Sequence, residues 1–309
     1  MPKVDLLTYI IPTYNESTNI AALYEKLVEH QIKGTDWEAL FVDDGSNDKS
    51  ADLISALAKK DSRVKLLSFS KNFGQQIAIK AGLDHANGDA VIILDADLQD
   101  PPEVFNDLYK AFKKGFDVVH ARRISRKGEN IFKKLTSFVF YRFFNLLSGI
   151  SIPNGVGDFR LMSKEVVSVL KNCNERDLFY RGLVPWVGFK QTIITFHRAK
   201  RLSGKTKFSF FKMAKLAIDS IISFSAIPLR ISIFLGILSS IFTFFYTFYI
   251  IYAYFLNQTV PGYASIMVAI LLLGSLNLLC LGLIGEYLRR IYTYQKQRPH
   301  YIIRQQINI

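Results

Sequence analysis

The sequence of 309 residues is poor in cysteine and tryptophan, with two of each. The cysteines, Cys173 and Cys280, are too few and too far apart for a disulfide framework or a cysteine metal cluster, which suits a reducing compartment. Residues 1–12 also lack the long apolar stretch of a signal peptide. We therefore expect the amino-terminal half of the chain to stay in the cytosol.

Acidic residues become scarce after residue 120. Residues 1–120 contain 13 Lys and Arg against 19 Asp and Glu, a net charge of −6, whereas residues 121–309 contain 26 against 7, a net charge of +19. A surface this basic suits a partner rich in phosphate, either a nucleic acid or an anionic lipid.

Charged residues are absent from two long apolar runs, residues 231–256 and 264–285, which a short uncharged segment separates. Each run is long enough to cross a bilayer as a helix. Lys and Arg flank both outer ends, so the positive-inside rule predicts a transmembrane hairpin with both ends in the cytosol. Anionic headgroups or a lipid phosphate then explain the basic half of the chain, and we expect no nucleic-acid partner.

The amino-terminal part alternates apolar runs typical of strands with amphipathic segments typical of helices. The predicted strands cover residues 6–11, before Pro12, and residues 39–42, 64–69 and 91–94. This alternation predicts βαβ units and a parallel sheet, whose ligands bind at the carboxyl ends of the strands. Polar clusters follow the strands at residues 14–16, 43–46, 71–72 and 95–97. Each cluster alone would suit a turn or a helix cap, but the set indicates a site.

Two carboxylates one residue apart, Asp95 and Asp97, follow the apolar run that ends at Leu94. Burial of carboxylates is costly unless a cation neutralises them. Oxygen ligands without a nearby Cys or His favour Mg²⁺ or Mn²⁺ over zinc, and Mg²⁺ commonly shares its shell with substrate phosphates. The alternative is a solvated acidic turn before a helix that begins at Pro101 or Pro102.

The middle of the chain combines basic and apolar stretches. Residues 135–152 form an aromatic, apolar run behind a basic flank, which suits a helix in the membrane interface; a buried core helix is the alternative. Residues 155–161 contain two glycines, which allow a tight turn that presents Asp158 and Arg160. Residues 198–215 contain seven Lys and Arg and no acidic residue.

Five motifs in order resemble the family-2 glycosyltransferases of the GT-A fold: IPTYNE, FVDDGS, DADLQDPPE, GDFRL and a late basic loop that contains glycine. More narrowly, the chain is similar to polyprenyl-phosphate glycosyltransferases related to dolichyl-phosphate mannose synthase, in the bacterial bactoprenol glucosyltransferase-like branch. The similarity extends through SFSAIPLR and the closing GEYLRRIYTYQKQRPHYIIR, and so covers nearly the whole length.

The resemblance implies an α/β fold with a GT-A, Rossmann-like and mostly parallel sheet, followed by interfacial amphipathic helices and a two-helix transmembrane hairpin. We expect a cytosolic glycosyltransferase domain at residues 1–205, which includes an interfacial helix near residues 130–150. A juxtamembrane amphipathic helix at residues 206–230 would follow. The two membrane helices would lie within residues 231–288, before a basic cytosolic tail at residues 289–309.

The resemblance also implies roles for individual residues. The nucleotide of the donor would be bound by Pro12, Tyr14, Glu16, Asp43, Asp44 and Asp95. Asp95, Asp97 and Gln99 would bind Mg²⁺ or Mn²⁺, which stabilises the diphosphate as it leaves. The catalytic residues would be Asp97 and Asp158, of which Asp158 is either a base or a residue that orients the acceptor. Whether Arg160 serves the site only by forming a salt bridge that positions Asp158 is left open. The phosphates of the acceptor and the diphosphate would be bound by Arg123, Arg126, Arg201 and Lys207.

These assignments predict inverting transfer of one hexose from a nucleoside diphosphate sugar to undecaprenyl or another polyprenyl phosphate, for glycosylation of the cell envelope. UDP-glucose is the expected donor, with UDP-N-acetylglucosamine and UDP-galactose as the open alternatives. The expected location is the cytoplasmic membrane, and Gly274, Ser275 and Gly282 offer a contact surface for a second copy of the chain. The alternative class is a membrane scaffold that binds a sugar nucleotide without catalysis, although such a protein should have degraded carboxylates.

Overall fold

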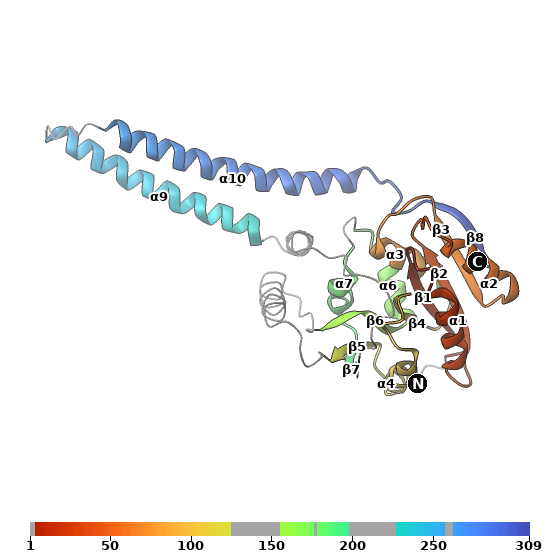
Figure 1. Ribbon diagram of the computed structural model, residues 1–309. Coiled ribbons are helices and arrows are strands. Elements are labelled where there is room, and N and C mark those ends of the chain that lie inside the picture. Colours follow the sequence, from red (N-terminus) through yellow and green to blue (C-terminus); the bar gives the residue numbers. More distant parts are fainter. Residues whose placement is uncertain (1–3, 125–154, 176–177, 198–226, 257–261) are drawn as a thin grey trace. The chain divides into compact units, whose positions relative to one another are not determined.

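The computed structural model describes residues 4–124, 155–175, 178–197, 227–256 and 262–309 (Figure 1). The described chain divides into two compact units. One unit holds the described residues up to residue 197 together with Arg298–Ile309, and the other holds two long helices. The expected interfacial helix near residues 130–150 lies outside the described residues, as do residues 206–226 of the expected juxtamembrane helix.

The first unit is built on one mixed sheet. Its strands are β1 (Leu6–Thr13), β2 (Asp36–Asp43), β3 (Val64–Phe69), β4 (Ala90–Ile93), β5 (Val118–Ile124), β6 (Val156–Ser163), β7 (Gln191–His197) and β8 (Ile303–Ile307). They lie in the order β7-β5-β6-β4-β1-β2-β3-β8. The neighbours β4, β1, β2 and β3 are parallel, whereas β6 is antiparallel to β4 and β8 to β3. The expected α/β fold with a Rossmann-like sheet is therefore confirmed.

All four predicted strands are present, and the first two are longer than predicted. The second strand was predicted at residues 39–42, whereas β2 covers Asp36–Asp43. The third strand was predicted at the residues where β3 lies. The first strand was expected to end before Pro12, but β1 continues through Pro12, which pairs with Val42, to Thr13. Proline lacks only the N–H group, and the carbonyl oxygen of Thr13 accepts a hydrogen bond from the Asp44 N–H at 2.8 Å. The polar cluster that begins at Tyr14 therefore follows the end of β1 directly.

Helices cover both faces of the sheet. They are α1 (Ile20–Glu29), α2 (Ser50–Lys60), α3 (Gln75–His85), α4 (Phe105–Lys113, after a 3₁₀ turn at Pro102–Val104), α6 (Lys164–Lys171) and α7 (Tyr180–Trp186). Apolar residues three and four apart place one face of each helix on the sheet, as Ile20, Leu23 and Leu27 do in α1. The hydroxyl of Ser163 caps α6 by accepting a hydrogen bond from the Val166 N–H at 3.4 Å.

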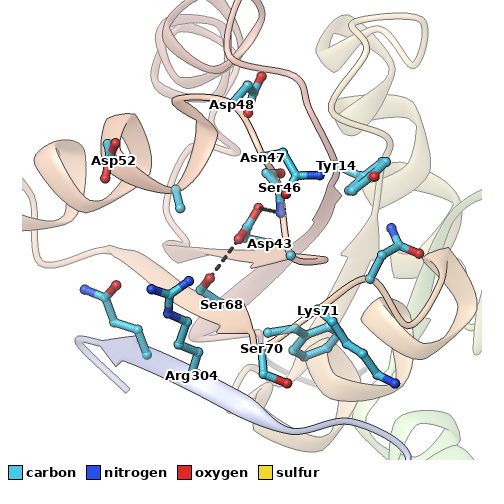
Figure 2. Close-up of a pocket in the computed structure, with 15 residues that line it drawn as sticks. Tyr14, Asp43, Ser46, Asn47, Asp48, Asp52, Ser68, Ser70, Lys71 and Arg304 are labelled. Atoms are coloured by element: carbon cyan, nitrogen blue, oxygen red, sulfur yellow. Dashed lines mark hydrogen bonds between the residues drawn. The ribbon is translucent and has the colours of Figure 1, made fainter.

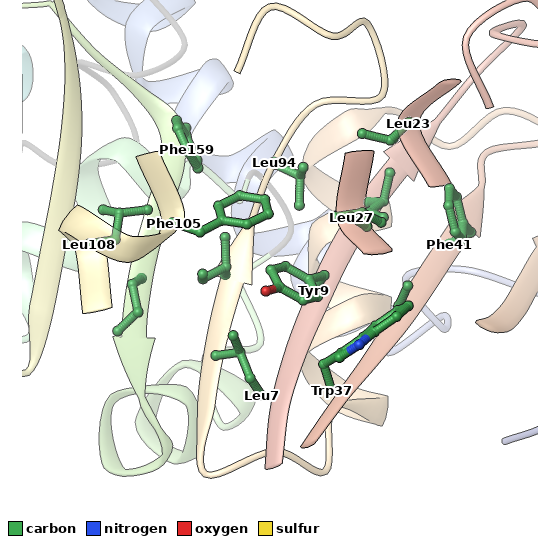
Figure 3. Close-up of a cluster of buried hydrophobic side chains, with 14 of the residues drawn as sticks. Leu7, Tyr9, Leu23, Leu27, Trp37, Phe41, Leu94, Phe105, Leu108 and Phe159 are labelled. Atoms are coloured by element: carbon green, nitrogen blue, oxygen red, sulfur yellow. The ribbon is translucent and has the colours of Figure 1, made fainter. Parts of the chain in front are cut away.

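The main core lies between the sheet and helices α1, α2 and α4 (Figure 3). Tyr9 of β1 packs against Phe105 of α4 and Trp37 of β2, with ring centroids 4.9 Å and 6.1 Å apart. A smaller core on the opposite face joins Leu67 and Phe69 of β3 to α3. Burial of each large side chain contributes roughly 1.5–3 kcal/mol. These two layers fix the strands whose carboxyl ends carry the polar clusters.

The second unit consists of α9 (Ile227–Phe255) and α10 (Tyr263–Gln295), which lie side by side (Figure 1). The structure thus has helices where the transmembrane hairpin was expected. Many of their apolar side chains are exposed, such as Phe234, Phe242 and Phe245. Within the described ranges, however, no helix is long and apolar enough to cross a membrane.

Candidate active site

The parallel strands β4, β1, β2 and β3 end at one edge of the sheet, and the predicted polar clusters meet there. A pocket of about 490 Å³ opens at the ends of β2 and β3 (Figure 2). Its polar lining includes Tyr14, Asp43, Ser46, Asp48, Ser68, Lys71 and Arg304. A concave, polar site at the carboxyl ends of parallel strands is the usual location of a ligand in this class of fold.

Asp43 is held rigidly in this pocket. One carboxylate oxygen accepts a hydrogen bond from the Ser68 hydroxyl at 2.7 Å, and the other accepts one from the Ser46 N–H at 3.2 Å (Figure 2). Gly45, between Asp43 and Ser46, has a φ of +67°, and a Cβ there would collide with the backbone of Lys71. The sharp turn that presents Asp43 therefore requires glycine at position 45.

Two of the predicted nucleotide residues line the pocket, and three others are not part of its lining. Tyr14 and Asp43 are in the lining. Asp44 accepts hydrogen bonds from the N–H groups of Phe73, at 2.6 Å, and Gly74, at 2.9 Å. Pro12 is buried within β1, and Glu16 accepts a hydrogen bond from the Asn19 side chain at 2.6 Å. Burial raises the pKa of Asp44 above its usual value, against the hydrogen bonds from Phe73 and Gly74, which lower it.

A network that the sequence did not reveal connects the β1 and β2 loops. Asn15, which has a φ of +54°, donates its N–H to the Ser46 hydroxyl at 3.0 Å and accepts from the Asn47 N–H at 2.9 Å. Asparagine is one of the few residues other than glycine that adopts this left-handed conformation readily. The network holds Tyr14 at the rim of the pocket.

A cluster of aspartates follows β4. Its members are Asp95, Asp97 and Asp100, with Asp158 of β6 beside them. Burial, together with the charges of Asp100, Asp158 and Asp97, raises the pKa of Asp95 to about 8, against the opposing charge of Arg123. The Asp95 side chain is nevertheless 30% exposed, so a ligand can reach it. The negative charges of the cluster are therefore not fully balanced by nearby positive charges, and Asp95 is the carboxylate that a cation can reach.

Asp97 and Gln99 face each other across a tight turn. The Gln99 N–H and side-chain amide donate to the two Asp97 carboxylate oxygens at 3.1 Å and 2.6 Å. Leu98 between them has a φ of +58°, which is unusual for a residue with a branched side chain and costs roughly 1–3 kcal/mol. Such strain is often found at functional sites.

The residues predicted to hold a metal fit a divalent cation in their chemistry. Within the described part of the chain, no group of three or more His, Cys, Asp or Glu side chains is arranged to hold a metal ion. Asp95, Asp97 and Gln99 offer hard oxygen ligands, and the raised pKa of Asp95 indicates unmet negative charge. They suit an ion that takes further ligands from a bound diphosphate.

Asp158 lies between two arginines. Arg181 of α7 donates to both Asp158 carboxylate oxygens, at 3.0 Å and 3.3 Å, and Arg160 lies 3.5 Å away. The side-chain amide of Gln76 donates to the same carboxylate at 3.5 Å. Burial raises the pKa of Asp158, but Arg181 and Arg160 outweigh it, so that the pKa lies below its usual value. Asp158 is therefore anionic at neutral pH.

The alternative role for Arg160, a salt-bridge partner that positions Asp158, agrees with its environment. Arg160 is fully buried, and its guanidinium donates to the carbonyl oxygens of Gly157 at 2.7 Å and Tyr180 at 3.2 Å. Arg181 was not predicted at all. No spacing or motif connects it to Asp158, because the two residues meet only through the packing of α7 beside β6.

Arg123, predicted to bind a phosphate, contacts two carboxylates of the site. Its guanidinium donates to the fully buried Asp100 at 2.9 Å and lies 3.9 Å from Asp95. This places Arg123 inside the aspartate cluster. The other three predicted phosphate ligands, Arg126, Arg201 and Lys207, lie outside the described residues.

Comparison with known proteins gives consistent matches. The family described as Glycosyl transferase family 2 matches residues 8–170. An uncharacterized glycosyltransferase of Bacillus subtilis (strain 168), YkcC, is 45% identical over 303 residues, which are 97% of this chain and 94% of that protein. A prophage bactoprenol glucosyl transferase homolog of Escherichia coli (strain K12) is 41% identical over 300 residues, 96% of this chain and 98% of that protein. The bactoprenol glucosyl transferase of Shigella phage SfV is equally similar, with 41% identity and the same coverage.

The fold is comparable to that of a solved glycosyltransferase structure. The mannosyltransferase PcManGT from Pyrobaculum calidifontis, in complex with GDP-Man and Mn²⁺, superposes with a TM-score of 0.52 over 71% of this chain and 63% of that chain. The sequence identity is 16%, so this likeness concerns the fold alone.

Proposed function

Because this chain belongs to glycosyl transferase family 2, we propose that it transfers one glucose from UDP-glucose to undecaprenyl phosphate or another polyprenyl phosphate. Support comes from the relatives named bactoprenol glucosyl transferase, which match nearly the whole chain at 41% identity. The observation that carries the proposal is that the Asp43 pocket, at the ends of β2 and β3, and the aspartate cluster, after β4, lie at the same carboxyl edge of the parallel strands.

The donor would occupy this edge of the sheet. The nucleoside of UDP-glucose would lie in the pocket, where the fixed carboxylate of Asp43 accepts hydrogen bonds from the base or the ribose. The diphosphate would then extend toward Asp95 and Asp97. A divalent ion held by Asp95, Asp97 and Gln99 would neutralise the negative charge of the departing UDP.

Asp158 and its arginines would act on the acceptor side. A phosphate oxygen of the lipid attacks the anomeric carbon of glucose, the bond to the diphosphate oxygen breaks, and the configuration inverts. The attacking phosphate is already ionised near neutral pH, and Asp158, anionic between Arg160 and Arg181, is a weak base. We therefore assign Asp158 the role of orienting the reactants through Arg181 rather than accepting a proton.

The long helices would attach the enzyme to the cytoplasmic membrane, where the lipid acceptor lies. The support is the uncharged sequence of residues 231–256 and the exposed aromatic side chains of α9. Both ends of the chain would then be cytosolic, in accordance with the flanking Lys and Arg. Sedimentation with membranes after carbonate washing tests this attachment, and release into the wash would contradict it.

The transfer itself is tested with the purified full-length protein. It is incubated with undecaprenyl phosphate, a divalent cation and labelled UDP-glucose, UDP-N-acetylglucosamine or UDP-galactose. We expect label in the lipid fraction from UDP-glucose. Label from another donor would correct the sugar, whereas binding of UDP-sugars without any lipid product would favour the non-catalytic scaffold.

A further inference from the structure

The carboxyl-terminal strand β8 is irregular where it passes the pocket. Ser68 of β3 faces Gln305, but the next residue of β3, Phe69, faces Ile303. Arg304 is therefore the extra residue of a β-bulge. A bulge turns a side chain out of the regular alternation of a strand and is frequent beside active sites.

The packing of β8 agrees with this bulge. Ile303 packs against the core beside α3, whereas Ile307 packs against the core beside α1 and α2 on the opposite face. In a regular strand, residues four positions apart lie on the same face. The extra residue changes the face, and Arg304 and Gln305 consequently both line the pocket.

The strand is anchored on both sides of the bulge. Before it, the Tyr301 ring stacks on Phe69 with centroids 5.2 Å apart, and the Tyr301 hydroxyl donates to Asp84 at 3.1 Å. After it, the Asn308 side chain donates to the carbonyl oxygen of Ala58 at 2.8 Å. Arg304 is thus mounted on a fixed element of the sheet and not on a loose basic tail.

The Arg304 side chain is directed into the pocket. Figure 2 shows it extending from β8 toward Ser68, with Asp43 beyond. Among the residues that the structure describes, no hydrogen bond or ion pair engages its guanidinium, although Asp43, Asp48 and Asp52 share the same pocket. A fixed arginine with five unused donors on a pocket wall is suited to a ligand that presents acceptor oxygens.

We propose that Arg304 recognises the base of the donor nucleotide by donating a hydrogen bond to a carbonyl oxygen of uracil. This proposal rests on the proposed function. The uracil edge presents an N–H group between two carbonyl oxygens, so an acceptor carboxylate and a donor guanidinium match adjacent positions on it. Asp43 and Arg304 supply these two groups at the Ser68 end of the pocket, while Asp95 and Asp97 stay with the diphosphate.

The test measures binding of UDP and of uridine, which lacks phosphate, to the full-length protein by calorimetry and ligand-observed NMR. We expect Arg304→Ala to weaken both ligands by about 10-fold, the effect of one hydrogen bond to a charged group. The matched control is Arg298→Ala, which removes an exposed arginine from the same terminal segment but outside the pocket lining, and which should bind as the wild type does. Equal melting temperatures verify the fold, and Arg304→Gln provides a second variant that should show the same loss.

The outcomes are distinct. Weaker binding of UDP with unchanged binding of uridine would make Arg304 a phosphate ligand and overturn the proposal. Equal binding of both ligands by Arg304→Ala and Arg298→Ala would also overturn it, and the proposed function would stand. Failure of the wild type to bind UDP would overturn the proposed function itself.

Discussion

Asp158 and Arg181 form a bidentate ion pair, although 23 positions separate them in the chain. The shorter contact, between Arg181 Nη2 and Asp158 Oδ2, is 3.0 Å. The Asp158 side chain is 3% exposed and that of Arg181 is 37% exposed, so the arginine reaches from solvent to a buried carboxylate. Under the proposed function, this geometry would present to the acceptor a cationic group whose orientation depends on Asp158.

Replacement of Arg181 should therefore impair transfer in a pH-dependent way. Arg181→Ala is expected to lower kcat by roughly 10- to 100-fold, because one charge-assisted contact is lost. In the wild type, Arg181 and Arg160 hold the pKa of Asp158 below its usual value. Without Arg181 this pKa should rise, so that on acidification the variant should lose activity at a higher pH than the wild type does. The control is Arg63→Ala, which breaks a peripheral pair with Asp61. An unchanged pH profile of kcat would contradict this role.

Asp97 is predicted to be indispensable for the metal-dependent step. Asp97→Ala should abolish transfer and remove the response of UDP binding to added Mg²⁺ or Mn²⁺, because a carboxylate ligand is lost. Calorimetry with and without the cation measures this response. Asp107→Ala, on the exposed surface of α4, provides the control. Turnover retained by Asp97→Ala would remove Asp97 from the metal site.

The pair between Arg123 and Asp100 should contribute to stability as well as to the site. Arg123→Ala leaves Asp100 buried without its partner, which is expected to cost about 3 kcal/mol in the free energy of unfolding. Urea denaturation measures this cost. The double variant Arg123→Ala/Asp100→Ala should recover part of the stability, since no buried charge is left unpaired. If Arg123 also binds the phosphate of the acceptor, the double variant should have a higher KM for the lipid than the wild type, with an unchanged KM for UDP-glucose.

Buried His120 should make the fold sensitive to acid. Burial and the nearby charge of Arg160 lower its pKa from 6.5 to about 4, against the hydrogen bond to Gln191. The unfolded chain therefore binds a proton at a higher pH than the folded chain, and stability falls as the pH falls. From about pH 7.5 to about pH 4.5 this group should account for roughly 2.5 kcal/mol of lost stability.

Chemical denaturation at the two pH values measures the loss. His120→Gln, which keeps a hydrogen-bonding side chain, should show a smaller decrease between them than the wild type. His30→Gln, at the end of α1, is the matched control and should behave as the wild type does. An equal decrease in all three proteins would assign the acid sensitivity to other groups.

Local pattern was sufficient for much of the donor side. Apolar runs of strand length identified β3 and β4. Asp43 and Asp95 were placed at strand ends because each directly follows such a run, and Asp97 lies two residues after Asp95. Parallel strands end at a common edge, so these carboxylates had to lie near one another. The roles of the individual residues, and the metal, stay predictions.

The acceptor side and the pocket wall depend on contacts that have no local signal. Arg181, Arg304 and the Asp100–Arg123 pair involve residues brought together from distant elements. The chain has 39 Lys and Arg, so charge alone cannot select the one that meets a given carboxylate.

The sequence by itself determined the family, the first four strands with the helices between them, and the carboxylates at the strand ends, because periodicity and motifs act over a few neighbouring residues. Tertiary structure alone decided that Arg123 turns to Asp100, that Arg181 holds Asp158, and that a one-residue bulge directs Arg304 into the pocket. The physical reason is that the direction of a long side chain is set by the register and packing of its element against others. A shift of one residue reverses the face on which that side chain lies.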